Sequence, residues 1–150
     1  MKKWFKIILA LFVTGIIAAI LVYIFVYNKP HPDYERLKPD YTLKAQELYN
    51  SFKTNLAGAN KLYNGKIIEI SGNLSKIDDR DTLVVAIFVF DSGMFGDAGV
   101  RCSFLTKFNE QAKKLQPGNN LRIKGYLTGF NDTDVILEQC SIINSKKVTQ

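Results

Sequence analysis

The chain has 150 residues, a formal net charge of +6 and 47% hydrophobic residues. Most of the excess positive charge lies near the two ends, because residues 41–145 contain 12 basic and 11 acidic residues. This near-neutral balance argues against a sequence-independent phosphate binder, which normally presents a basic face. The single histidine, His31, lies in a proline-rich stretch, which argues against a Cys-His nucleophile pair and a histidine-rich metal site.

Residues 7–27 form an uninterrupted run of 21 residues without a charge. A helix of this length is about 31 Å long, which matches the hydrocarbon core of a bilayer. A cleaved signal peptide is the alternative, but its apolar core usually spans roughly 7 to 15 residues and ends at small residues. Here Ala18 and Ala19 are followed by eight more apolar residues. We therefore predict an uncleaved transmembrane helix.

The charges that flank this run predict an orientation. Lys2, Lys3 and Lys6 lie on its amino side, and the amino terminus adds another positive charge. Lys29, Arg36 and Lys38 on the far side nearly balance this count, but the amino-side charges lie closer to the membrane. The positive-inside rule therefore favours residues 1–6 in the cytoplasm and the following domain outside. We expect a single-pass protein of the inner (cytoplasmic) membrane with a periplasmic C-terminal domain.

Three of the four prolines lie in residues 28–40, which we predict to be an extended linker. Residues 41–145 then form the globular domain, and residues 146–150 a short tail. The domain opens with apolar residues at helical spacing over 42–54, with Thr42 as the candidate cap, and a second short helix or turn is expected over 57–63.

Five segments have the alternation or the β-branched composition of strands: residues 66–74, 83–90, 100–104, 120–129 and 135–143. Polar or glycine-rich connections separate the first three, and a helical pattern over 105–115 separates the third from the fourth. Five short strands with a helix between the third and fourth are the plan of the OB-fold. Gly72 and Gly125 interrupt two strands, as the coiling of a small barrel requires. We therefore predict a mainly β protein with a five-stranded OB-fold barrel, preceded by an N-terminal helix and the transmembrane helix.

Six stretches in chain order resemble the tRNA_anti-like OB family: YNKPHPDY, LKAQELYNSF, ANKLYNGKIIEISGNLSKI, MFGDAGVRCSF, LQPGNNLRIKGYLTG and VILEQCSI. The resemblance covers about Asp40 to Ile143. It implies an OB barrel, which in bacterial members often follows a single membrane-spanning helix. The motifs are those of a barrel and imply no catalytic residues. A second similar group, the small periplasmic OB proteins, implies a ligand-binding or stress-related role.

OB-folds bind ligands on the face of their second and third strands, between the loops that join strands one to two and four to five. Here those loops carry five aspartates: Asp78, Asp79, Asp81, Asp132 and Asp134. Such rims repel phosphate and suit a basic peptide, a carbohydrate or a cation. Neither loop has the spacing of a calcium loop, and aspartate is a common turn residue, so we predict no metal and no cofactor.

Aromatic and basic side chains near this face are the candidates for ligand contact: Phe95, Arg101, Lys124, Tyr126 and Phe130. Phe95 lies in a glycine-flanked loop, where its ring either closes the end of the barrel or meets a partner. Cys102 and Cys140 are read either as two buried hydrophobic residues or as a disulfide, because the third and fifth strands of an OB barrel are neighbours.

The sequence contains no nucleophile–base spacing and no phosphate-binding loop, so we do not predict an enzyme. We predict a non-catalytic, membrane-anchored OB-fold binding module of the cell envelope, whose ligand is a protein or a saccharide. Two alternatives stay open. One is a nucleic-acid-binding OB domain that takes tRNA or single-stranded DNA, and the other is a structural component of an envelope complex.

Overall fold

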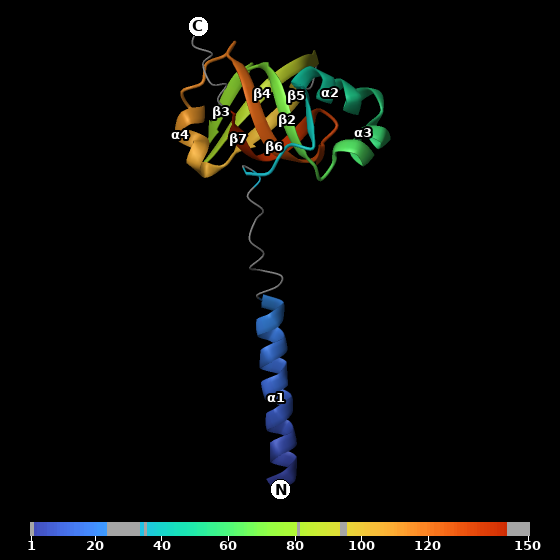
Figure 1. The fold of residues 1–150 in the computed structure, drawn as a ribbon, viewed down its shortest axis with the longest axis vertical. Helices are drawn as coiled ribbons and strands as arrows, with labels where there is room; N and C mark the ends of the chain where they lie inside the picture. Colours follow the sequence, from blue (N-terminus) through green and yellow to red (C-terminus); the bar gives the residue numbers. More distant parts are fainter. Residues whose placement is uncertain (1, 24–33, 35, 81, 94–95, 144–150) are drawn as a thin grey trace. The chain divides into compact units, whose positions relative to one another are not determined.

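The structure is a computed structural model that describes residues 2–23, 34, 36–80, 82–93 and 96–143 (Figure 1). The chain divides into two units, residues 1–32 and 33–150. The first contains α1 (Lys2–Val22), whose described side chains are all exposed. Over Lys3–Val22 this helix is long and apolar enough to cross a membrane. Residues 24–27 of the predicted span lie outside the described residues.

The second unit is built on a seven-stranded sheet with three helices. Its elements in chain order are β1 (Tyr41–Lys44), α2 (Ala45–Thr54), α3 (Leu56–Tyr63), β2 (Ile67–Asn73), β3 (Lys76–Arg80), β4 (Leu83–Gly93), β5 (Gly96–Phe104), a 3-10 turn (Thr106–Phe108), α4 (Asn109–Ala112), β6 (Asn120–Phe130) and β7 (Asp134–Ile142). The strand order is β1-β2-β6-β7-β5-β4-β3, so the sheet begins and ends on strands that precede β4 in the chain. The domain is mainly β, as predicted.

Strands near the two ends of this sheet are linked directly, because β2 and β3 are consecutive parts of one bent strand. Only Leu74 and Ser75 separate them. Leu74 N donates to Asn119 O, next to β6, at 2.9 Å, and Ser75 N donates to Ile87 O of β4 at 3.0 Å. The ladder is interrupted at this bend. The sheet therefore curls into an OB-like barrel that stays partly open.

The core lies inside the curled sheet. Residues 84–88 of β4 are buried on both faces, which confirms the prediction from their continuous β-branched run. Helix α2 packs over one end of the barrel (Figure 1), where Leu48 and Phe52 are fully buried. Every residue of the buried core lies between Ala45 and Cys140. The domain therefore supplies its own core without any residue of α1.

The start of the domain differs from the prediction of a helix from residue 42. Residues 41–44 form β1, which pairs in parallel with β2. The preceding Asp40 directs them into the sheet, because Asp40 N donates to Ile67 O and Asp40 Oδ2 accepts from Ile67 N, both at 2.8 Å. Helix α2 then begins at Ala45, where Glu47 Oε2 accepts from Lys44 N.

Three further bounds differ. The predicted polar connection over 75–81 contains strand β3, and β4 and β5 extend into the predicted glycine-rich loop as far as Gly93 and Gly96, which pair with each other. The predicted helix over 105–115 is a 3-10 turn followed by the short α4. The helix at 57–63 is confirmed as α3. These differences lie at polar or glycine-rich segments, where tertiary pairing decides the conformation.

Candidate binding site

The predicted ligand face lies on the outer side of β4 and β5. In this pair Val85 lies opposite Ser103 and Ile87 lies opposite Arg101. Although Val85 and Ile87 are not part of the core cluster, they are only 9% and 2% exposed. The outer face of β4 therefore presents little apolar surface to a ligand.

Arg101, a predicted ligand residue, is bound to Asp134 at the start of β7. Arg101 Nε donates to Asp134 Oδ2 at 2.7 Å, and the other carboxylate oxygen accepts from Gly99 N at 3.1 Å. The Asp134 side chain is 5% exposed and that of Arg101 is 31% exposed. Asp134 is thus a structural clamp between β5 and β7 rather than an open part of the rim.

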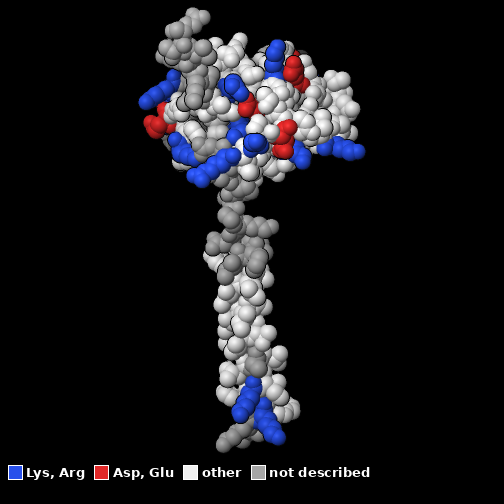
Figure 2. Space-filling view, in the orientation of Figure 1, with Lys and Arg blue, Asp and Glu red and all other residues white. Residues whose placement is uncertain are grey.

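Two other rim aspartates are also neutralised. Arg80 contacts Asp78 at 3.0 Å, and Lys113 of the segment after α4 contacts Asp79 at 3.3 Å. Asp132 occupies an exposed turn with a φ of 72°, and Asp81 lies outside the described residues. The repulsion of phosphate expected from these loops is therefore weaker than the sequence suggests. Figure 2 shows basic and acidic side chains interspersed on the visible face of the domain.

Lys124 and Tyr126, two more predicted ligand residues, contact the chain's own linker segment, residues 34–40. Lys124 Nζ donates to Leu37 O at 2.7 Å, and the Tyr126 ring stacks on that of Tyr34 with the centroids 4.9 Å apart. This part of the predicted 28–40 linker lies on the domain instead of extending from it, and the second unit includes it.

The four predicted residues that the structure describes do not form one site. The Phe130 ring stacks on Phe52 of α2, with the centroids 5.7 Å apart, at the end of the barrel. Arg101 lies on β5 and Lys124 on β6, and β7 separates these two strands. Phe95 lies outside the described residues, so its role stays a prediction.

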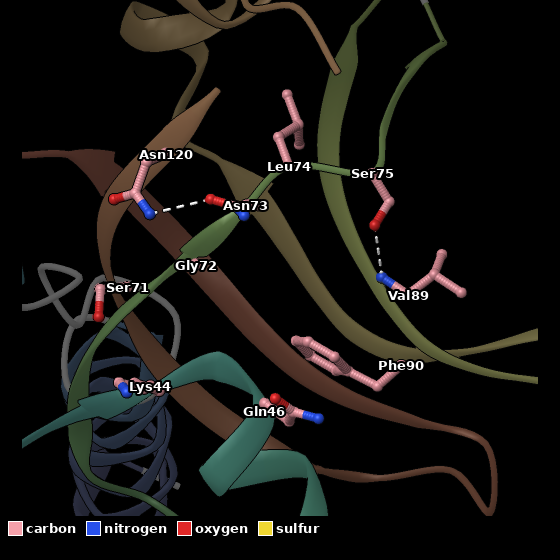
Figure 3. Close-up of a pocket in the computed structure, with 10 residues that line it drawn as sticks. All are labelled: Lys44, Gln46, Ser71, Gly72, Asn73, Leu74, Ser75, Val89, Phe90 and Asn120. Carbon is pink, nitrogen blue, oxygen red and sulfur yellow. Dashed lines mark hydrogen bonds between the residues drawn. The ribbon is translucent and has the colours of Figure 1, made fainter. Parts of the chain in front are cut away.

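A pocket of about 420 Å³ lies instead at the bend between β2 and β3. It is lined by the start of α2, the bend itself, β4 and the first residue of β6 (Figure 3): Lys44, Gln46, Ser71, Gly72, Asn73, Leu74, Ser75, Val89, Phe90 and Asn120. Gly72 allows α2 and β4 to lie close to β2 here, because a Cβ at Gly72 would lie 3.3 Å from both Ala45 Cβ and Phe88 Cδ1. The interruption of the ladder thus coincides with a hollow.

The polar groups of this pocket are mostly neutral. Asn120 Nδ2 donates to Asn73 Oδ1 at 2.9 Å, and Ser75 Oγ accepts from Val89 N at 2.8 Å. Figure 3 shows the half-buried ring of Phe90 pointing from β4 toward the middle of the lining residues. Among the described residues that line the pocket, Lys44 is the one charged side chain.

Sequence reasoning missed this pocket because its residues come from four distant segments. The one local signal is the run Ser71-Gly72-Asn73 directly after Ile67–Ile70, which is apolar except for Glu69. A glycine between polar residues in a strand marks a bend or a close approach of the backbone, and both occur here.

The two cysteines are buried, free thiols in the structure. Burial, together with the neighbouring Cys102 thiol, raises the pKa of the Cys140 thiol well above its usual value. Within the described residues, no three His, Cys, Asp or Glu side chains are grouped as ligands for a metal ion.

The fold resembles that of solved structures. A "putative nucleic acid-binding lipoprotein" from Klebsiella pneumoniae subsp. pneumoniae aligns with a TM-score of 0.53 at 18% identity, covering 77% of this chain and all of that one. Asparaginyl-tRNA synthetase from Pyrococcus horikoshii aligns at 16% identity with a TM-score of 0.41, over 71% of this chain and 23% of its own. The S. pombe Stn1-ten1 complex aligns at 19% identity with a TM-score of 0.36, over 53% and 59% of the two chains.

Among curated protein sequences, none matches the chain. The similarity to the lipoprotein shows the OB fold and no more, because the identity is below the range in which function transfers. The model of one protein family, in contrast, matches residues 1–142, which include the apolar helix as well as the barrel. The chain therefore belongs to the tRNA_anti-like family of OB-fold binding domains.

Proposed function

We propose that this protein is a non-catalytic, membrane-tethered OB-fold domain that binds a saccharide in the pocket at the β2–β3 bend. The observation that carries this proposal is the lining, which combines neutral amide and hydroxyl groups with one aromatic ring. Ligand sites in proteins are commonly concave, with a few placed polar groups beside apolar surface.

The chemistry of the lining matches that of a sugar. Sugar hydroxyls both donate and accept hydrogen bonds, as do the amides of Gln46, Asn73 and Asn120. Each of the two asparagines keeps unused capacity after their mutual bond, because an amide offers two donor hydrogens and an acceptor oxygen. Phe90 adds apolar surface for the C–H face of a ring.

The charge of the pocket restricts the ligand further. Lys44 alone suits a neutral ligand or one with a single negative charge. A polyphosphate backbone is normally neutralised by several lysine or arginine side chains. An uncharged sugar or a sugar with one carboxylate therefore fits this lining better than a nucleic acid strand.

The location is part of the same proposal. An uncleaved span over residues 7–27 would anchor the chain in the inner membrane, with residues 1–6 in the cytoplasm and the domain in the periplasm. A reporter fused after Gln150 tests the orientation. Activity of a periplasm-dependent reporter supports it, and activity of a cytoplasm-dependent reporter alone contradicts it.

A second candidate is binding of single-stranded nucleic acid on the β4–β5 face. The observation that favours it is the pairing of Asp78, Asp79 and Asp134 with basic side chains, which removes much of the repulsion at the rim. The name of the Klebsiella lipoprotein points the same way. The strong dependence of such binding on salt distinguishes it from sugar binding.

The deciding experiment uses the full-length protein in detergent micelles. It is applied to a glycan array and, in parallel, titrated with labelled single-stranded DNA and tRNA at two salt concentrations. We expect glycan binding that Asn120→Ala weakens about tenfold, which corresponds to one hydrogen bond of ~1.4 kcal/mol. Asn60→Ala on α3, a residue outside the pocket lining, is the matched control and leaves binding unchanged.

Two results would contradict the saccharide proposal. Salt-sensitive retention of nucleic acid, unaffected by Asn120→Ala, assigns the second function. If the protein binds neither glycans nor nucleic acid and the full chain co-purifies in a complex, a structural role in the cell envelope is favoured.

A further inference from the structure

We propose that Cys102 and Cys140 become joined by a disulfide, and that the bond forms before the core of the barrel closes. The inference is independent of the ligand. It rests on the oxidising location proposed above and on three features of β5, β6 and β7 that direct the two side chains into the same part of the core.

The first feature is a β-bulge in β7. On β5, Cys102 lies opposite Leu137 and Phe104 lies opposite Cys140, so two steps on β5 match three on β7. Neighbouring β6 shows the same mismatch, with Tyr126 opposite Glu138 and Lys124 opposite Ser141. At this point β7 therefore has one extra residue relative to each of its neighbours, β5 and β6.

The bulge decides which way Cys140 points. Side chains alternate along a regular strand, so residues three apart, such as Leu137 and Cys140, lie on opposite faces. Here both are fully buried in the core. Gln139 absorbs the extra residue with a φ of 52°, a left-handed conformation that is uncommon and unfavourable for a residue other than glycine. This strained residue turns Cys140 toward the interior, where Cys102 also lies.

The second feature is the absence of a side chain at Gly125 of β6. A Cβ at this position would lie 2.4 Å from Cys140 Sγ, which is far inside van der Waals contact. Gly125 therefore leaves the space that the sulfur occupies. Any other residue would displace Cys140 or the bulge.

The third feature is the enclosure of both thiols. Cys102 and Cys140 are each 0% exposed and belong to the same core cluster. The raised pKa of Cys140 keeps it protonated at neutral pH in the folded, reduced domain. Because the thiolate is the reactive species, the folded domain is a poor substrate for thiol oxidation.

The reaction needs an oxidant that carries a disulfide, such as a dithiol oxidase of an oxidising compartment. The thiolate of one cysteine attacks this disulfide, forms a mixed disulfide and releases one thiol of the oxidant. The thiolate of the second cysteine then attacks the sulfur of the first, which forms the Cys102–Cys140 bond and releases the second oxidant thiol. Two protons and two electrons pass to the oxidant, which leaves as a dithiol.

The test traps the thiol state of the full-length protein as it is made. Membranes from the producing bacterium are dissolved directly in denaturant with an excess of alkylating reagent, and the intact mass is measured. We expect no alkylation and a mass lower by two hydrogen atoms than that of the reduced chain. Two alkyl groups per chain would overturn the proposal.

A second measurement tests the order of events. Reduced, folded protein in detergent is mixed with oxidised glutathione, with and without denaturant. We expect the bond to form in denaturant and the native sample to stay reduced over the same time. Equal rates in the two samples would refute formation before closure. Cys102→Ser is the control, and its single thiol is alkylated only after denaturation.

Discussion

Asp134 should be one of the most important polar residues for the stability of the barrel. Its carboxylate is 5% exposed and accepts from the Gly99 N–H and from Arg101. In Asp134→Ala the buried Gly99 N–H loses its partner, which costs about 1–3 kcal/mol. Arg101 is 31% exposed and regains water, so its lost pairing adds on the order of 1 kcal/mol or less. The total is about 1–4 kcal/mol of unfolding free energy.

Asp134→Asn should lose only part of this unfolding free energy. The amide oxygen can still accept from the Gly99 N–H, but the amide nitrogen faces the guanidinium of Arg101. We expect a cost of about 1–2 kcal/mol. Asp132→Asn is the matched control, because Asp132 is exposed two residues away with a φ of 72° that asparagine tolerates. It should change stability by no more than about 0.5 kcal/mol.

The assay is urea unfolding of residues 33–150, which contain the whole core, followed by far-UV circular dichroism. Tryptophan fluorescence does not serve, because the single tryptophan is Trp4 in α1. The slope of free energy against urea should stay constant among the variants. If Asp134→Ala costs no more than Asp132→Asn, the carboxylate does not clamp β5 to β7 and the reasoning is wrong.

Three further outcomes are expected. Gly99→Ala should cost about 3 kcal/mol or more in urea unfolding, because its Cβ would lie 1.8 Å from Phe88 O; a cost below about 1 kcal/mol would contradict this. Tyr126→Ala should speed tryptic cleavage in the linker segment without a comparable loss of stability, whereas Thr128→Ala on the same strand should not, and equal rates would refute the attachment. The hydrogen bond from Lys76 on β3 lowers the pKa of the Asp97 carboxyl below its usual range, so the stabilisation by Asp97 is present above the unfolded-state pKa and is lost as the pH falls through the lower folded-state pKa. Asp97→Asn should therefore make the unfolding free energy fall less steeply at acid pH. An unchanged fall would show that Asp97 does not contribute to it.

Strand alternation was sufficient to predict most of the barrel. Within the continuous run of residues 83–90, residues 84–88 are buried on both faces, and the helical segment between the third and fourth predicted strands is present in shortened form. Strand β3 was missed because Ile77 is its one apolar residue, which is too little for a period of two to be recognised. Its pairing with β4 supplies what the local pattern lacks.

The functional residues were less predictable, because their partners are distant in the sequence. Lys124 and Leu37 are 87 positions apart, and no local pattern indicates that the linker occupies this lysine. Gln139 is similar, since glutamine has no marked preference for a left-handed conformation. The predicted ligand residues were chosen by type and strand, and the topology then separated them onto β5 and β6.

The interruption of the sheet at Leu74 and Ser75 has a practical consequence for finding the ligand. The bend divides the strand into β2 and β3, and the pocket occupies the same place. A molecule bound across the bend would contact both halves of the bent strand, and because the pocket exists only in the folded domain, it would bind only the native state. Saturation at 100 times the dissociation constant adds about 2.7 kcal/mol, so a rise in melting temperature across a panel of sugars can identify the ligand without a label.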